Sequence, residues 1–252
     1  MSEAPFLTAE WRHVAMLNYE VGRSALLGRV PRGTELDEWQ GRSYLSVVGF
    51  LFLDTRVLGV PIPFHRDFEE VNLRFYVRRK AEDGWRRGVV FVKELVPRAA
   101  IALVARTLYN ENYAAVPMSH ELQRSPDGSG VRSVSYRWRV GGRQHQLSVS
   151  VAGEPAPLLP GSHEEFIAEH YWGYSVQRDG GTCEYRVQHP SWRVAPATRA
   201  ELDCDVARVY GEPFGALLGA QPTSAFLADG SEVSVSRGVR LERSADRSVE
   251  NL

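Results

Sequence analysis

Charged side chains stand at a junction in this sequence where their neighbours are apolar. In FVKELVPRAAIALVARTLYNENY, residues 91–113, Glu94 and Arg98 flank the step from a predicted buried strand into an apolar helix. A desolvated carboxyl group can act as a general acid or base, and an arginine can hold the carboxylate of a small acid by charge-assisted hydrogen bonds. We therefore predict that Glu94 and Arg98 belong to a pocket, as an acid/base group and an anion clamp.

A second polar group occurs in EEVNLRFYVRRK, residues 69–80. Strict alternation places Glu70, Asn72 and Arg74 on one face of a strand and apolar residues on the other. Periodicity alone favours the solvent-exposed face for the polar row. If the row instead faces the inside of a barrel, it brings an acid, an amide and a base to one cavity, and Glu70 becomes a catalytic candidate.

Four further residues are candidates for ligand binding. Arg106 lies eight residues after Arg98 on the same helical stripe, although its commoner role would be that of an ion partner for a nearby glutamate. Tyr109 and Tyr113 end the helix four residues apart and either place hydroxyls at the pocket mouth or pack at the helix end. His189, in QHPSW, is either a general acid or base or a histidine held by backbone bonds beside a rigid Pro-Trp corner.

The elements that must position these residues are mainly strands. A continuous apolar run at residues 43–60 suits a buried strand with a bend at Gly49. Turn residues mark two hairpins, which pair residues 69–80 with 84–95 and residues 131–140 with 143–151. Further strands are expected near residues 183–189, 222–228 and 232–242.

Helices are few. After Pro97, an alanine- and leucine-rich run predicts a helix to about Asn110. Ser162 stands three residues before Glu165, a capping box that predicts a helix over about 163–171, and a shorter helix is expected at 200–210. His170, inside the capped helix, is expected at the surface. Many short strands with few helices predict a mainly antiparallel sheet, closed or sandwiched, with helices packed outside.

Composition excludes several classes of function. The net charge of −1 offers no general attraction for nucleic acid or anionic lipid, and the two cysteines have no metal-ligand spacing. No phosphate-binding loop, dinucleotide fingerprint or Gly-x-Ser-x-Gly elbow is present, so we predict neither a cofactor nor a metal. The chain carries no recognisable signal peptide or membrane span, which favours a cytoplasmic protein.

Five segments in order carry a family resemblance. They are PRGTELDEWQGRSYLSVVGF, FEEVNLRFYV, GVVFVKELVPRAAIALVARTLYNENYAAVPM, FIAEHYWGY and VQHPSWRV. Together they resemble the YqjF-like family of conserved bacterial proteins, which is grouped with acetoacetate decarboxylase-like proteins. The resemblance spans about residues 10–240 and implies one cone-shaped β-barrel-like domain over 1–252 with an interior pocket, leaving a frayed tail at 243–252. It also favours an interior position for Glu70.

The segment ELVPRA, residues 94–99, departs from the decarboxylase pattern. In acetoacetate decarboxylase a glutamate strand leads to a lysine that forms an imine with the keto acid, whereas arginine and alanine stand at the corresponding place here. A guanidinium stays protonated and cannot condense with a ketone. Lys93 is adjacent, but strand alternation puts it on the opposite face from Glu94.

These patterns predict a pocket for a small organic acid or keto compound. If the protein is an enzyme, the expected reaction is a lyase or isomerase step without imine chemistry. The alternatives are a non-catalytic binding or sensing module that uses the same pocket, and a structural or interaction barrel with a filled core. A small carboxylate or keto ligand is the expected partner, with neither nucleic acid nor membrane, and exposed sheet edges would allow a homodimer.

Overall fold

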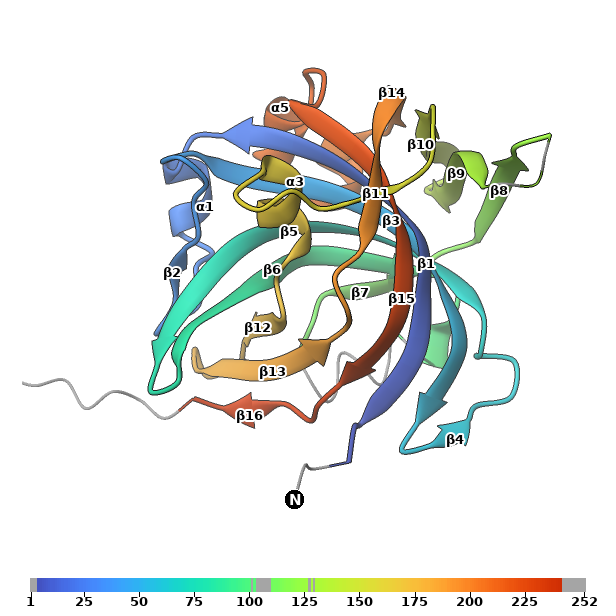
Figure 1. Ribbon diagram of the computed structural model, residues 1–252. Helices are drawn as coiled ribbons and strands as arrows, with labels where there is room; N and C mark the ends of the chain where they lie inside the picture. Colours follow the sequence, from blue (N-terminus) through green and yellow to red (C-terminus); the bar gives the residue numbers. More distant parts are fainter. Residues whose placement is uncertain (1–3, 101, 103–109, 127, 129, 242–252) are drawn as a thin grey trace, which may run out of the picture.

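Strands, mostly in antiparallel pairs, make up more than half of the residues that this computed structural model describes, which are 4–100, 102, 110–126, 128 and 130–241. Five of them are long and curved and run side by side (Figure 1). They are β15 (Ser224–Val235), β1 (Leu7–Val21), β3 (Ser43–Val57), β5 (Phe68–Ala81) and β6 (Gly84–Val96).

The sheet curls into a ring. Beyond β6 it continues through β12 (Trp172–Val176) and β13 (Thr182–Gln188), and β13 also pairs with β15. Val187 lies opposite Val235 and Gln188 opposite Ser234, so the ring closes over a short ladder. Closure creates an inside, which a flat sheet would lack. The short strands β2 (Glu35–Leu36), β4 (Val60–Pro61), β7 (Tyr113–Ala115) and β16 (Val239–Arg240) pair with members of this ring.

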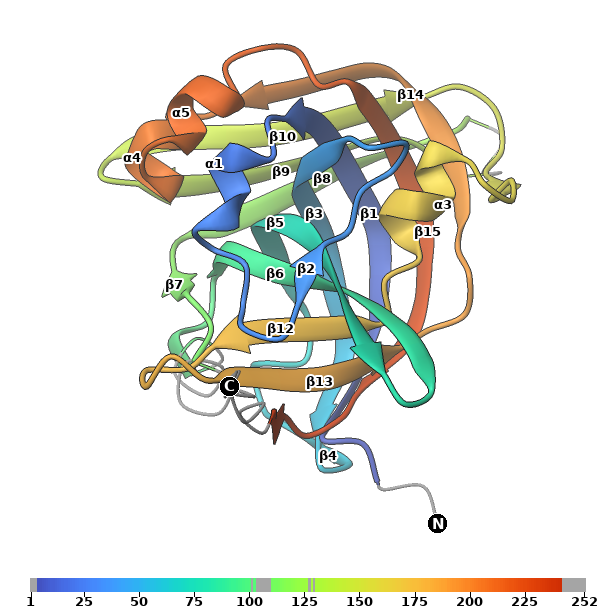
Figure 2. The same ribbon diagram turned by 90° about the vertical axis from the view of Figure 1, so that its left-hand side faces the viewer.

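A second layer covers part of the outside of the ring. From β15 the sheet turns through β14 (Arg193–Asp203), β10 (Arg143–Val151), β9 (Val131–Val140) and β8 (Met118–Arg124), with β11 (Ala156–Pro157) beside β14 (Figure 2). Tyr136 and Trp138 of β9 share a buried apolar cluster with Leu73 and Phe75 of β5. At Gly49 a Cβ would lie 2.6 Å from the Tyr136 ring, so this glycine permits a close approach of the two layers.

Both faces of β5 are therefore buried. Val71 and Leu73 face the second layer, whereas Glu70, Asn72 and Arg74 face the inside of the ring and are at most 8% exposed. The solvent-exposed placement favoured by periodicity is wrong. Alternation correctly separated the two faces, but a second layer outside and a closed ring inside remove both from water.

The described helices are short: α1 (Ser24–Leu27), α3 (His163–Ala168), α4 (Val206–Tyr210) and α5 (Phe214–Leu217). The capping box is confirmed, because the Ser162 hydroxyl accepts a hydrogen bond from the Glu165 backbone N–H at 3.1 Å. The expected 200–210 helix starts only at Val206, since β14 extends to Asp203. Of the helix expected after Pro97, residues 99, 100 and 102 are helical, and 101 and 103–109 lie outside the described residues.

The predicted hairpins are confirmed, but β1, which at 15 residues is as long as β3, was not predicted. Ala81 pairs with Gly84 and Val140 with Arg143, as the turn residues indicated. The two strands expected at 222–228 and 232–242 are mostly one strand, β15, which continues through Gly230.

None of the helices in the described part of the chain has the length and apolarity needed to cross a bilayer.

Candidate functional site

A cavity of about 290 Å³ lies inside the ring. Side chains from β1, β3, β5, β6, β12, β13 and β15 form its wall, together with Ala168 of α3 and His170 just after it. Most of the wall is apolar, and aromatic residues are frequent: Trp11, Phe50, Phe52, Phe68, Phe91, Trp172 and Trp192. A concave apolar chamber with a few convergent polar groups is the usual form of a small-molecule site.

The polar groups follow one line across the sheet. Asn72 of β5 lies opposite Glu94 of β6, and Glu94 lies opposite Tyr113 of β7. Asn72 Nδ2 donates to Glu70 Oε1 at 2.9 Å, and the Tyr113 hydroxyl donates to Glu70 Oε2 at 3.2 Å. The same hydroxyl hydrogen-bonds the carboxyl group of Glu94. Because a hydroxyl has one proton, it can donate to Glu70 while it accepts from a protonated Glu94.

Burial raises the pKa of both carboxyl groups. Glu70 is 2% exposed, and desolvation raises its pKa to about 7 against the opposing hydrogen bonds from Asn72 and Tyr113 and the charge of Arg74. Glu94 is 1% exposed, and burial together with the charges of Glu111 and Glu70 holds its pKa well above the ordinary value. At neutral pH the pair thus offers a protonated acid next to a group close to its titration midpoint.

A third glutamate adjoins this pair. Glu111 is half-buried as a residue, and the burial of its carboxyl group raises its pKa to about 8. The Tyr185 hydroxyl of β13 donates to Glu111 Oε1. Gly173 of β12 makes room for that tyrosine, since a Cβ there would overlap the Tyr185 ring.

One arginine lies on the cavity wall among the described residues that line it. Arg74 is 8% exposed, its guanidinium lies 5.7 Å from the centre of the Tyr76 ring, and its Nη2 contacts Met16 Sδ at 3.8 Å. Arg74 Nε has no hydrogen-bond partner among the described residues. A buried guanidinium without a carboxylate at bonding distance is suited to an anionic ligand.

His170 forms the wall near Arg74 and is buried, which corrects its expected surface position. Its Nε2 lies 3.2 Å from Asp37 Oδ2, which also accepts from Arg87 Nε at 2.6 Å. Burial lowers the pKa of His170 to about 4 despite the hydrogen bond with Asp37, so the imidazole is neutral at pH 7. Its Nδ1 has no partner among the described residues.

The predicted site residues fall into three groups. Glu70, Glu94, Tyr113 and His189 all line the cavity. Arg98 is half-buried at the strand-to-helix turn and is not among the described residues that line it, so the arginine on the wall is Arg74.

Arg106 and Tyr109 lie outside the described residues, so their expected roles in ligand binding stay predictions. His189 stacks on Trp192, with ring centres 4.4 Å apart, and its Nδ1 lies 2.9 Å from the carbonyl oxygen of Pro190. That contact requires a proton on Nδ1, because a carbonyl oxygen only accepts.

Lys93 points away from the cavity, as alternation predicted. Its Nζ donates to the carbonyl oxygen of Val209 at 2.7 Å on the outer side of β6. The register of β6 has an irregularity here, because Leu73 pairs with Lys93 but Arg74 pairs with Phe91. Val92 is therefore the extra residue of a β-bulge, which lets both Phe91 and Glu94 face the cavity.

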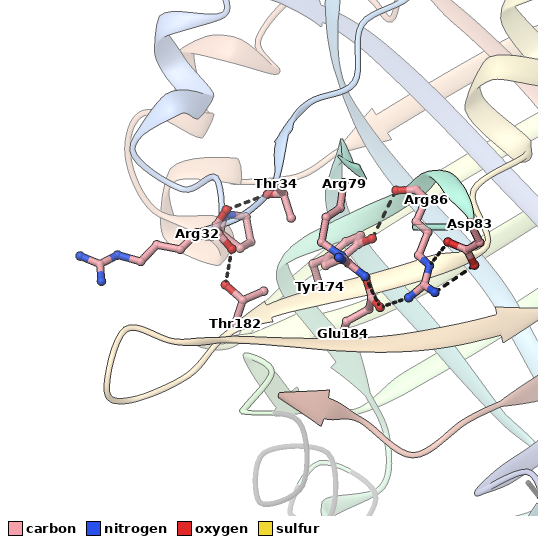
Figure 3. Close-up of polar contacts among 9 residues, drawn as sticks. Arg32, Thr34, Arg79, Asp83, Arg86, Tyr174, Thr182 and Glu184 are labelled. Atoms are coloured by element: carbon pink, nitrogen blue, oxygen red, sulfur yellow. Dashed lines mark hydrogen bonds and ion pairs between the residues drawn. The ribbon is translucent and has the colours of Figure 1, made fainter. Parts of the chain in front are cut away.

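An ion-pair network holds the hairpin of β5 and β6 against β13 (Figure 3). Glu184 accepts from Arg79 Nε at 2.6 Å and from Arg86 Nη1 at 2.5 Å, and its side chain is 5% exposed. Arg86 also pairs with Asp83, and the Tyr174 hydroxyl donates to the Arg86 carbonyl at 3.2 Å. This network fixes the strands that carry Tyr185 and Glu94. No group of three metal-ligating side chains occurs within the described ranges.

Comparison with known proteins agrees with this architecture. The uncharacterized protein YqjF of Bacillus subtilis (strain 168) is 26% identical over 181 residues, 71% of this chain and 72% of that protein. The enduracididine biosynthesis enzyme MppR complexed with pyruvate has a TM-score of 0.66 at 14% identity, covering 96% of this chain and 92% of that chain. Acetoacetate decarboxylase from Legionella pneumophila has a TM-score of 0.65 at 13% identity, covering 94% and 87%.

At these identities the solved structures show the fold, and the expected acetoacetate decarboxylase-like architecture is confirmed. The expected YqjF-like resemblance is confirmed as well. A family model matches residues 8–232, and the chain therefore belongs to DUF2071, a family of uncharacterized conserved proteins.

Proposed function

We propose that the cavity binds a small 2-oxo acid and that the protein catalyses proton transfer at the carbon beside the keto group, a lyase- or isomerase-type step without an imine. One observation carries this proposal. Six buried polar atoms of cavity-lining residues have no partner among the described residues: Trp11 Nε1, Thr55 Oγ1, Asn72 Oδ1, Arg74 Nε, Glu94 Oε2 and His170 Nδ1. Buried polar atoms are normally satisfied, so their convergence on one chamber supports a polar ligand there.

Arg74 and Glu94 suit the two ends of a 2-oxo acid, its carboxylate and its keto oxygen. Arg74 is positively charged, so it attracts the carboxylate of the ligand. Glu94 keeps its proton through burial, so it can donate a hydrogen bond to the keto oxygen. The fold neighbour MppR has been solved with pyruvate, which is a 2-oxo acid.

Proton transfer follows from the pKa of Glu70. With a pKa near 7, a large fraction of Glu70 is ionised at neutral pH and can take a proton from the carbon beside the keto group. The C–H electron pair moves into the new C–C double bond, and the carbonyl electrons move to oxygen. The resulting enolate oxygen accepts a hydrogen bond from protonated Glu94, which stabilises its charge.

Hydrogen–deuterium exchange tests both parts of the proposal. We expect the protein to accelerate exchange of the methyl protons of pyruvate in D₂O, followed by NMR, and Glu70→Gln to slow this exchange by about 100-fold or more with little change in pyruvate affinity. Arg74→Gln should weaken pyruvate binding by roughly tenfold. Glu69→Gln and Arg78→Gln are matched controls, because Glu69 bonds His120 and Arg78 bonds Glu35 outside the cavity.

Failure of pyruvate and other 2-oxo acids to bind would overturn the proposal. Binding without any exchange would favour the second candidate, a non-catalytic binding module. That candidate is supported by the position of Lys93, because no lysine is among the described residues that line the cavity. Exchange that Glu70→Gln leaves unchanged would remove Glu70 as the base.

A further inference from the structure

The cavity is polar in its middle and aromatic toward one end. On the inner face of β5 the order is Phe68, Glu70, Asn72, Arg74. Phe52 of β3 lies opposite Phe68, and Phe50 lies opposite Glu70. An aromatic region therefore begins directly beside the candidate base on the side away from Arg74, and Phe91, opposite Arg74, is a separate ring on the wall.

The aromatic end is built from rings in contact with one another. Phe52 and Phe68 are stacked, with centres 4.7 Å apart, and Trp11 lies 5.8 Å from Phe52 and 5.1 Å from Phe50. Trp192 lies 6.3 Å from Trp11, and its indole N–H donates to Ser231 Oγ at 2.9 Å. These contacts hold the rings together and give this end of the cavity a largely apolar surface, in which the Trp11 indole N–H is a polar group with no partner among the described residues.

Exposed apolar side chains occur in the segment that follows β3. The connection from β3 to β5 carries large apolar side chains in water: Leu58 is 55% exposed, Val60 59% and Phe64 91%. Ile62 of the same connection is 37% exposed and lines the cavity. His65 of this connection also lines the cavity, so the connection contributes one apolar and one polar side chain to the wall.

The volume exceeds what a minimal keto acid needs. A dry apolar cavity of about 150 Å³ holds a benzene molecule, and this cavity of about 290 Å³ has nearly twice that volume. Pyruvate has a single methyl group beyond its keto acid and would leave the aromatic end without a ligand contact. A ligand with a ring-sized apolar group would bury that surface against rings of the wall.

We propose that the preferred ligand is a 2-oxo acid with an apolar substituent about the size of a phenyl ring, bound with its keto acid between Arg74 and Glu94 and its substituent against Phe52 and Phe68. This assignment rests on the proposed function and names its substrate class. Phe52 is then a specificity-determining residue, because it contacts the substituent and not the keto acid.

Titration calorimetry with pyruvate and phenylpyruvate tests the assignment. We expect phenylpyruvate to bind the native protein at least about tenfold more tightly than pyruvate, since it buries a ring that pyruvate lacks. Phe52→Ala should weaken phenylpyruvate binding by about fivefold and change pyruvate binding by less than about twofold. Trp85→Ala is the matched control, because Trp85 is 48% exposed on β6 and does not line the cavity.

The outcomes separate this assignment from the proposed function. Equal affinities, or tighter binding of pyruvate, would overturn the assignment and leave the function in place. Absence of binding for both acids would overturn both. If thermal unfolding shows that Phe52→Ala does not fold, Phe52→Leu replaces it. If that variant prefers phenylpyruvate over pyruvate by the same factor as the native protein, Phe52 is excluded as a specificity residue.

Discussion

Glu184 and Glu94 are both buried glutamates on strands of the same ring, yet their surroundings are opposite. Glu184 accepts hydrogen bonds from two arginines, Arg79 and Arg86, and these contacts outweigh burial and lower its pKa. Glu94 has no ion pair with an arginine among the described residues, and burial with two neighbouring carboxyl groups raises its pKa. One carboxyl group is kept ionised, and the other is kept protonated.

This contrast indicates which of the two regions is structural. A buried ion pair with both partners satisfied joins elements of a fold, as Glu184 does for β13 and the hairpin of β5 and β6. Glu70, Glu94 and Glu111 share a chamber in which Arg74 is the one arginine among the described lining residues. Such an excess of buried acids opposes the stability of the fold, and groups of this kind concentrate at functional sites.

Neutralising the two glutamates should have unequal effects on stability. Glu184→Gln leaves Arg79 and Arg86 without their carboxylate, and we expect a loss of about 3 kcal/mol in the free energy of unfolding. Glu94→Gln replaces a neutral acid by a neutral amide and should change stability by less than about 1 kcal/mol at pH 7. Urea unfolding measures both, and equal losses would contradict the assigned charge states.

The raised pKa of Glu70 should make the protein less stable as the pH rises. Folded Glu70 keeps its proton to about pH 7, whereas an unfolded glutamate loses it near pH 4.5, so the folded state binds more protons between these values. We expect stability to fall by about 2 kcal/mol between pH 5 and pH 8 from Glu70. Glu70→Gln should flatten this part of the pH profile; an unchanged slope would refute the raised pKa.

The ion-pair network should produce the opposite dependence at acid pH. The lowered pKa of Glu184 means that the unfolded state binds more protons, so its stabilisation is present above the unfolded pKa and lost as the pH falls. The effect should be smaller than that of Glu70, because the side chains of Arg79 and Arg86 are 20% and 25% exposed and therefore screened by water. Thermal unfolding of Glu184→Gln below pH 5 should lack this loss.

The smallest effect is expected for an ion pair on the same hairpin that is open to water. Arg78 and Glu35 are 2.7 Å apart, with side chains 39% and 50% exposed. Glu35→Gln should change the free energy of unfolding by less than about 0.5 kcal/mol. A loss as large as that of Glu184→Gln would show that burial does not distinguish the two pairs.

Local signals in the sequence predicted the hairpins and the fold class. The turns Asp83-Gly84 and Gly141-Gly142 lie directly between strands that pair with each other, so short-range chemistry fixes them. Closure of the ring depends instead on Val187 and Val235, which are far apart in the sequence. No local pattern specifies that contact.

The strand β1 was missed because its alternation changes partway. Trp11 and Val14 both line the cavity although three positions separate them, since the register against β3 shifts between Arg12 and Ala15. His13, inside this shift, has a φ of 55°. A pattern search for strict alternation reads such a segment as irregular. The break expected between strands 222–228 and 232–242 is absent, because Gly230 lies within β15, opposite Arg12.

The candidate site was partly predictable for the same reasons. Alternation and the family resemblance together predicted Glu70, Glu94 and Tyr113 as pocket residues. Arg74 lay on the same predicted strand face as Glu70 but was not predicted as a site residue. Tyr185 and His170 come from distant segments and reach the cavity only through ring closure and the position of α3. Nothing in their own sequence context distinguishes them.

The bulge at Val92 selects which functional group the chamber contains. If β6 paired regularly with β5 from Phe91 onward, Lys93 rather than Glu94 would lie opposite Asn72, and a primary amine would enter the chamber in place of an acid. A single inserted position on one strand thus separates two kinds of carbonyl chemistry on the same scaffold. Members of this fold could exchange one for the other by a change in strand pairing, without altering either side chain.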